Sequence, residues 1–297
     1  MNKLPILIDT DPGIDDLFCI AIGCAFSDVF DLKALTTIGG NNTTAVTTRN
    51  ALNILKLFKR EDVAVAKGAD SFLKEPFGEP VAKFHGHNGI GDVTIEDSPC
   101  QPSELSASEM IYKCAREEAG QLVIVTVGPE TNLAVALQRH PDLKDLVKKI
   151  VVMGGSLTTG NISPYAEANI GHDAYAADIV FSSGIPIDMV GLDITRKAPL
   201  KKEIFADITD ADERIKEVML KLIEFRNEES MHDAIAISSL VDKDIIGFEP
   251  CNISIVTEGE RKGQTVTDKN GPLLHRAAVS IDIERYQDLM REMLIRL

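Results

Sequence analysis

The chain lacks the features that mark membrane-bound, secreted and disulfide-stabilised proteins. No stretch approaches the roughly 18 apolar residues of a membrane span, and the opening apolar run, residues 4–8, is too short for a signal peptide. The five cysteines are an odd number without Cys-x-x-Cys spacing, which is typical of reduced thiols. These absences predict a soluble, cytoplasmic protein without a membrane partner.

Positive charge is also scarce. The 31 Lys and Arg residues face 46 Asp and Glu residues, which gives a net charge of -15 spread along the chain. Such a surface argues against nucleic acid or anionic membranes as partners. Apolar residues make up 44% of the 297 positions, enough for a large core, and there is neither a repeat nor a low-complexity linker. We therefore expect one elaborated domain over residues 1–297.

Short apolar, β-branched runs alternate with helix-like segments. The runs are residues 4–8, 32–38, 63–66, 122–127, 150–153 and 187–190, and the candidate helices are residues 43–58, 106–119, 132–139 and 173–182. This alternation predicts an α/β fold with an open, mainly parallel, doubly wound (Rossmann-like) sheet that has helices on both faces. Residues 74–102 are rich in Gly and Pro and predict a long loop or several short pieces. Residues beyond 200 read as mostly helical, with strands at 253–256 and 277–281 and a last helix from 283.

The first run leads into a turn with four carboxylates within eight residues, Asp9-Thr10-Asp11-Pro12-Gly13-Ile14-Asp15-Asp16. These acids repel one another unless a cation compensates them, and a hard divalent cation bound through oxygen is the simplest answer. Capping of the following helix accounts for one or two of them only. The turn is not an EF-hand, because the twelfth position from the first acid is Ile20, where that loop needs a Glu.

Small and polar residues follow the other predicted strands, at positions 39–42, 127–129, 154–155 and 191–193. In open α/β sheets, ligands bind at the carboxyl ends of the strands. The loop with Asn161, Glu167 and Asn169 offers donors and acceptors that suit sugar hydroxyls, although a surface loop with Asn-based turns has the same composition. Asp233, after His232, is either a helix N-cap or a metal ligand. These features predict a metal- and sugar-binding cleft.

Taken together, these stretches resemble the inosine–uridine-preferring nucleoside hydrolase family. The matching segments keep the family's order from residue 4 to about 240, and they are Asp9-Thr10-Asp11-Pro12-Gly13-Ile14-Asp15-Asp16, Thr36-Thr37-Ile38-Gly39-Gly40-Asn41, His85-Gly86, Thr131-Asn132-Leu133-Ala134, Val152-Met153-Gly154-Gly155, Gly160-Asn161, Ala166-Glu167-Ala168-Asn169 and Met231-His232-Asp233. The resemblance implies calcium-dependent hydrolysis of the N-glycosidic bond of a ribonucleoside to ribose and free base, in a catabolic or salvage role. Relatives are commonly dimers or tetramers, so a homodimer or homotetramer is expected.

The resemblance also implies a role for each matching residue. Calcium would be bound by three carboxylates and one backbone carbonyl, those of Asp11, Asp16, Asp233 and Val127. Asp11 would be the general base, and His232 would protonate the leaving base, with His85 a second pocket histidine. The ribose hydroxyls would be held by Asp15, Asn41, Asn161, Glu167 and Asn169.

Two departures from the family bear on the base that is cleaved. Ala168 stands where many relatives have Phe, and the segment 225–230, which lines the base pocket in the family, looks shortened. The chain has no Trp, so purine stacking between tryptophans is excluded. Pyrimidine or mixed specificity is favoured. Two other interpretations stay open: a metal-dependent phosphohydrolase of the haloacid dehalogenase type, although Gly13 stands where that motif needs Thr or Val, and a non-catalytic nucleoside- or ribose-binding protein.

Overall fold

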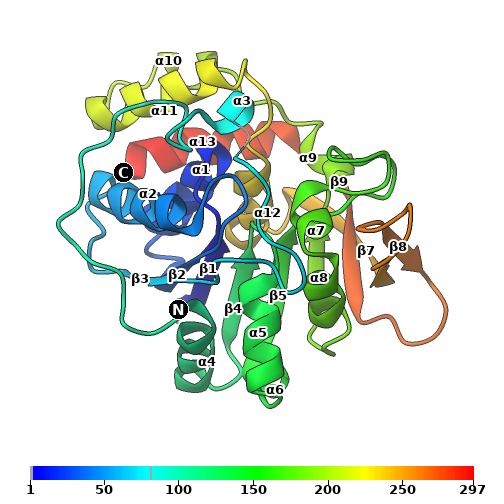
Figure 1. Ribbon diagram of the computed structural model, residues 1–297. Coiled ribbons are helices and arrows are strands. Elements are labelled where there is room, and N and C mark those ends of the chain that lie inside the picture. The colour runs from blue at the N-terminus through cyan, green and yellow to red at the C-terminus, as the bar shows by residue number, and fades with distance from the viewer. Residues whose placement is uncertain (1–2, 81) are drawn as a thin grey trace.

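A single open sheet forms the centre of the computed structural model, which describes residues 3–80 and 82–297 (Figure 1). Its strand order is β3-β2-β1-β4-β5-β6-β9-β7-β8. The strands from β3 to β9 in this order are parallel, whereas β7 is antiparallel to both β9 and β8. The strands are β1 (Leu4–Thr10), β2 (Phe30–Thr37), β3 (Ala64–Lys67), β4 (Leu122–Thr126), β5 (Val147–Met153), β6 (Ile187–Val190), β7 (Ile246–Ile255), β8 (Thr265–Asp268) and β9 (His275–Ile281). The predicted α/β fold with a mainly parallel sheet is confirmed.

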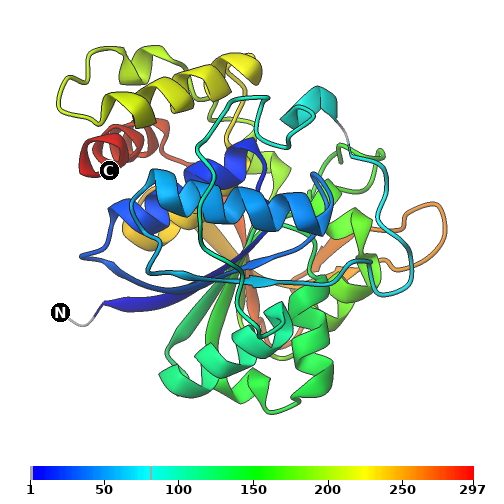
Figure 2. The same ribbon diagram turned by 60° about the vertical axis from the view of Figure 1, so that its left-hand side comes forward.

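Helices cover both faces of the sheet, as Figure 2 shows. The longer ones are α1 (Ile14–Ala25), α2 (Thr44–Leu57), α4 (Ala107–Glu118), α5 (Thr131–Arg139), α8 (Ala174–Phe181), α11 (Glu213–Phe225), α12 (His232–Val241) and α13 (Ile283–Arg296). Successive side chains of β1 point to opposite faces of the sheet and therefore belong to two separate hydrophobic cores. Ile6 and Ile8 belong to the core with α1, α2, α11, α12 and α13. Leu7 belongs to the core with α4, α5 and α8. The continuous apolar runs in the sequence reflect this double burial.

The C-terminal part extends the sheet in a way that the sequence predicted only partly. Strands near 253–256 and 277–281 and the last helix are present as β7, β9 and α13, but β8 was not predicted. The hairpin of β7 and β8 packs on the polar loop after β5. Gln264 pairs with Ala166, and the Thr265 hydroxyl donates to the Ser156 carbonyl. This hairpin therefore supports the loop that carries Asn161, Glu167 and Asn169.

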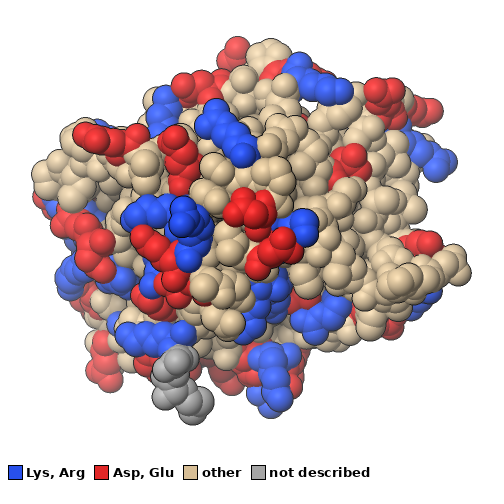
Figure 3. Space-filling model, turned by 90° about the horizontal axis from the view of Figure 1, so that it is seen from below, with Lys and Arg blue, Asp and Glu red and all other residues tan. Residues whose placement is uncertain are grey.

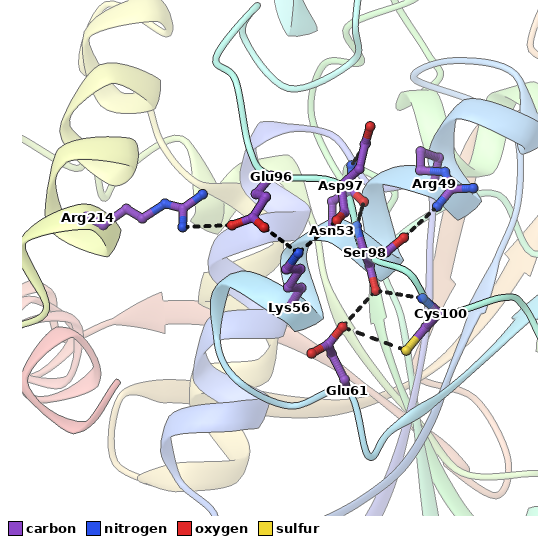
Figure 4. A network of polar contacts seen from close by, with 9 residues as sticks. All are labelled: Arg49, Asn53, Lys56, Glu61, Glu96, Asp97, Ser98, Cys100 and Arg214. Atoms are coloured by element: carbon purple, nitrogen blue, oxygen red, sulfur yellow. Dashed lines mark hydrogen bonds and ion pairs between the residues drawn. The ribbon is translucent and has the colours of Figure 1, made fainter.

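The predicted loop at 74–102 is largely irregular, with one short helix, α3 (Ala82–His85). Polar contacts fix its second half, as Figure 4 shows. Glu96 pairs with Lys56 of α2 at 2.6 Å and with Arg214 of α11 at 3.2 Å. The Asn53 amide accepts from the backbone of Ser98 at 2.9 Å. The loop is thus bound to two helices of one face, and its first half carries α3, which ends at His85. Helix α3 lies in the upper part of the molecule in Figure 1.

The surface shows charges of both signs. The face seen from below in Figure 3 has Lys and Arg interspersed with Asp and Glu. Within the described residues, no helix is both long and apolar enough to cross a membrane.

Candidate active site

A cavity of about 600 Å³ opens where the carboxyl ends of the parallel strands meet. Of the site residues predicted from the sequence, all but Asp11 and Asp16 line it, namely Asp15, Asn41, His85, Val127, Asn161, Glu167, Asn169, His232 and Asp233. Asp11 and Asp16 are buried next to Asn41, which contacts both of them. The loops after β1, β2, β4 and β5, helix α3 and the start of α12 therefore converge on one place, as the sheet topology requires.

Three buried carboxylates form the closest acidic group in the described part of the chain. Asp15, Asp16 and Asp233 each offer an oxygen within 4.8 Å of the others. Burial, together with the charge of Asp15, raises the pKa of Asp16 to about 7. Burial and the charges of Asp15 and Asp16 raise the pKa of Asp233 well above its usual range. Carboxylates in this arrangement fit a divalent cation, which would offset their repulsion.

Asp11 lies beside this group and is linked to it through Asn41. The Asn41 backbone N–H donates to Asp11 Oδ2 at 2.7 Å, and its side-chain amide donates to Asp16 at 3.2 Å. The other oxygen, Asp11 Oδ1, is buried without a hydrogen-bond partner among the described residues. Burial and the charge of Asp16 raise the pKa of Asp11 well above its usual range. An unpartnered buried carboxylate oxygen is costly in isolation and suits a cation that the protein does not itself supply.

Asp15 differs from its neighbours in having cationic groups nearby. Burial alone would raise the pKa of Asp15, but the charges of Arg226, His85 and His232 outweigh that effect and lower it. Of these three groups, the guanidinium is the one that stays charged at any working pH. Asp15 is therefore an anion suited to accepting hydrogen bonds.

Gly13 explains how the acidic turn fits against its neighbours. A Cβ on this residue would lie 2.4 Å from His85 Nδ1 and 2.6 Å from the side-chain nitrogen of Asn41. Only glycine leaves room for both side chains, so the Thr or Val that the phosphohydrolase motif needs would not fit here.

The polar loop after β5 is held by hydrogen bonds to its own backbone. Glu167 caps the short helix α7 (Ala168–His172) by accepting from the Asn169 and Ile170 N–H groups, and it also accepts from the Gly155 N–H at 2.9 Å. The Asn169 side-chain amide donates to the carbonyls of Val127 and Met153 at 3.2 and 3.0 Å. The Asn169 side-chain oxygen is left for a donor such as a hydroxyl.

Two of the histidines that line the cavity, His85 and His232, are held at one ring nitrogen each. His85 Nδ1 accepts from the Ile14 N–H at 3.2 Å, and burial lowers the pKa of His85 to about 4. His232 Nδ1 lies 2.7 Å from the Thr195 hydroxyl on α9 (Leu192–Thr195), and burial lowers the pKa of His232 as well. Both rings are therefore neutral near pH 7, and their Nε2 atoms are the ones left for a ligand.

Several cavity residues were not predicted individually. The segment 225–230 was expected at the base pocket, and Arg226, Glu228 and Glu229 do line the cavity. His172 also lines it, although no role was predicted for it; its position three residues after Asn169, on the same short helix, was the only available signal.

Residues 6–288 match the model of the family described as inosine-uridine preferring nucleoside hydrolase. The chain belongs to this family. The match spans both the acidic turn and the His232–Asp233 pair, so the carboxylate group and the cavity are features of a nucleoside hydrolase, a ribonucleoside N-glycosidase. The phosphohydrolase and binding-protein interpretations are therefore set aside.

Similar proteins cover nearly the whole chain. The pyrimidine-specific ribonucleoside hydrolase RihA of Salmonella typhi is 35% identical over 98% of both chains, and the non-specific ribonucleoside hydrolase RihC of Klebsiella pneumoniae is 35% identical over 96% of both. Among solved structures, the plant nucleoside hydrolase PpNRh1 has a TM-score of 0.92 at 30% identity, with 99% of both chains covered. The purine-preferring ribonucleoside hydrolase from Gardnerella vaginalis has a TM-score of 0.91 at 30% identity, with 98% of both covered. These names differ in base preference, so family membership does not decide the base.

Proposed function

We propose that this nucleoside hydrolase is a calcium enzyme that cleaves pyrimidine ribonucleosides, or pyrimidine and purine ribonucleosides alike, to ribose and free base. The observation that carries the proposal is the set of buried carboxylates beside the cavity, of which Asp16 and Asp233 lie within 4.8 Å of Asp15 and Asp11 keeps an unpartnered oxygen among the described residues. Asp11, Asp16, Asp233 and the Val127 carbonyl are the residues that would hold calcium, which takes six to eight oxygen ligands. When bound, calcium would offset the carboxylate charges, bind vicinal hydroxyls and acidify a neighbouring water.

Asp11 is the residue we assign as general base. Its Oδ1 has no partner among the described residues and is therefore available for a proton. Attack of water at C1′, on the face opposite the base, would break the bond to nitrogen and invert the anomeric centre.

The ribose hydroxyls are assigned to Asp15, Asn41, Asn161, Glu167 and Asn169. Four of these side chains have geometry that suits the role: Asp15 is anionic, the Asn41 and Asn169 amides have their nitrogens committed to protein acceptors, and Glu167 is fixed by backbone N–H groups. Side chains that are already fixed lose little conformational entropy when the sugar binds.

His232 is assigned to the departing base, with His85 beside it. If the Thr195 hydroxyl donates to Nδ1 of His232, then Nε2 keeps the ring proton and becomes the donor toward the cavity. A neutral imidazole can donate this hydrogen bond to a base nitrogen or oxygen as negative charge develops there.

The preference for pyrimidines is supported by what the cavity lacks. Ala168 lines it with a small side chain, and the chain has no Trp that could stack on a purine. The pyrimidine-specific name of one relative agrees with this preference, whereas the non-specific name of the other supports the broader alternative.

The first test is release of reducing sugar from uridine, cytidine, inosine and adenosine in phosphate-free buffer, with calcium and again after chelation. We expect calcium-dependent release of ribose, with uridine and cytidine cleaved at least as fast as the purine nucleosides. Absence of release from all four by folded, calcium-loaded protein would contradict the proposal.

A variant tests the two roles assigned to Asp11, as base and as calcium ligand, together. Asp11→Ala should lower kcat by about 10²–10⁴-fold, the usual contribution of a positioned general base, while the folded state survives. Asp11→Asn is the matched isosteric variant and should lose a similar factor. Activity retained in either variant would show that another group accepts the proton.

A further inference from the structure

A buried guanidinium lies in the cavity wall, at the segment that joins α11 to α12. Arg226 follows the last residue of α11, is 9% exposed and lines the cavity near Phe84 and His232. One terminal nitrogen, Nη2, donates to Glu229 at 3.0 Å. Its Nε atom is buried and has no hydrogen-bond partner among the described residues. A buried cation with unused donors in a ligand cavity indicates a group that is completed by the ligand.

The backbone beside Arg226 is strained, which supports the same conclusion. Asn227 and Glu228 both have left-handed conformations, with φ of 57° and 60°. Asn tolerates this region, but Glu does so rarely and at a cost. The turn places Arg226, Glu228 and Glu229 together in the cavity wall. Strain retained at a cavity is a common sign of a functional segment.

The charge of Arg226 acts on three ionisable groups that line the cavity with it. Its charge affects Asp15, His85 and His232, and its guanidinium lies 5.9 Å from the ring of Phe84. The two histidines each have one ring nitrogen committed to the protein. An arginine offers several coplanar N–H donors and cannot lose its proton at working pH, so it suits an oxygen that gains negative charge.

We propose that Arg226 contacts the leaving base and donates to the carbonyl oxygen beside the glycosidic nitrogen, where it stabilises the negative charge that forms as the bond breaks. This inference rests on the proposed function. The electron pair of the C1′–N bond leaves with the base, water adds to C1′, and the proton of that water ends on the base. Uracil and cytosine have a carbonyl at this position and adenine has none, so the contact also selects pyrimidines.

The test compares two ribosides whose leaving groups differ in how much stabilisation their negative charge needs. Uridine releases a basic uracil anion, whereas 4-nitrophenyl β-D-ribofuranoside releases a stable nitrophenolate. Arg226→Gln should lower kcat/KM for uridine by about 10²-fold, as removal of an oxyanion donor does, and for the nitrophenyl riboside by roughly threefold or less. The kcat/KM of Arg226→Lys for uridine should lie between those of the unmodified enzyme and Arg226→Gln, because lysine keeps the charge without the planar guanidinium.

Arg214→Gln is the matched control, because Arg214 is an exposed arginine at the other end of α11. Its activity on both substrates should equal that of the unmodified enzyme. Equal losses on both substrates in Arg226→Gln would assign Arg226 to the ribose end or to the fold, and no loss on either would remove it from the reaction. Both results would overturn the inference.

Binding of free uracil to calcium-loaded protein separates this inference from the proposed function. Calorimetry should show a dissociation constant about tenfold higher for Arg226→Gln, the size expected for loss of a charged hydrogen bond. This measurement needs no turnover, so it still decides the role of Arg226 if the hydrolysis assay fails. Unchanged uracil affinity would overturn the contact, whatever the enzyme cleaves.

Discussion

Two sets of buried acids on the same sheet differ in how their charge is compensated. Asp188 on β6 has a side chain that is 6% exposed and lies between cations from both neighbouring strands. Arg276 of β9 donates two hydrogen bonds at 2.6 and 2.7 Å, and Lys149 of β5 donates one at 2.7 Å. Burial alone would raise the pKa of Asp188, but these two cations lower it below its usual value.

At three acids beside the cavity, burial and repulsion are not offset by neighbouring cations. Burial and mutual repulsion raise the pKa of Asp11, Asp16 and Asp233, and no Lys or Arg of the described chain forms an ion pair with any of them. The same sheet thus surrounds one acid with cations and leaves three without. Charge compensated within the fold contributes to structure, whereas uncompensated buried charge indicates a ligand of opposite sign. The comparison can be tested by removing one acid from each set.

The largest effect is expected at the cavity. Asp233→Asn removes one uncompensated charge and one expected calcium ligand, so uridine hydrolysis should fall by about 10³-fold or more, as for loss of a central catalytic group. In chelator, the variant should be at least as stable as the unmodified protein, because a repulsive charge is gone. Thermal unfolding with and without calcium measures this, and a calcium-induced rise in Tm that survives in the variant would exclude Asp233 as a ligand.

The next largest effect is expected in the pH dependence of stability, which should have opposite signs for Asp16 and Asp188. Asp16 has a pKa of about 7 when folded and an ordinary value of 3.8, so the folded state keeps a proton that the unfolded chain has lost. In chelator, this group should therefore destabilise the fold as pH rises from about 4 to about 7, by up to about 1.4 kcal/mol per pH unit. Asp188 acts with the opposite sign: its lowered pKa contributes stability above its unfolded value, and that stability is lost as pH falls below it.

Urea unfolding at about pH 5, 6 and 7 tests this sign. Calcium binds the deprotonated acids, so the stability it adds should grow over the same interval. Asp16→Asn should flatten the slope in chelator, although Asp9 and Glu130 have pKa values raised by burial to about 7 and 8 and contribute in the same direction. Stability that rises with pH in chelator would contradict the assignment.

Most of the uncompensated set was predictable from residue spacing, and the compensated acid was not. Asp11 and Asp16 lie in one turn with Asp9 and Asp15, four acids within eight residues, so their repulsion is visible without a structure. Asp233 lies far along the chain, and only the family resemblance joined it to them. Asp188 meets Arg276 only because β9, far along the chain, inserts beside β6. Such a pairing leaves no local signal. Strand β8 was missed for a related reason, since four mostly exposed residues provide neither an apolar run nor an alternating pattern.

Within the site, the sequence identified which residues meet but not which atoms do. The closest carboxylate group contains Asp15, whereas the resemblance implied Asp11 as the third acidic ligand. That difference depends on side-chain rotamers in one turn, which spacing does not determine. Arg226 likewise lies in a segment expected at the base pocket, but its unpaired Nε is visible only once the neighbouring side chains are placed.

The smallest effect tests the compensated set. Asp188→Asn should cost about 1–3 kcal/mol of stability, less than the loss of a fully buried pair, because Arg276 and Lys149 are 47% and 27% exposed and can regain water. Calcium-dependent hydrolysis should stay within about twofold, since Asp188 does not line the cavity.

Glu217→Gln is the control for Asp188→Asn, because the ion pair of Glu217 with Lys221 on α11 has both side chains more than half exposed. Its unfolding free energy in urea should change by less than about 0.5 kcal/mol. If the unfolding free energies of the two variants fall by the same amount, then burial does not determine how much these ion pairs contribute to stability. Asp188→Asn could instead keep the unfolding free energy of the unmodified protein and lose turnover. A compensated acid would then serve the reaction, and the distinction between structural acids and ligand-binding acids would be wrong.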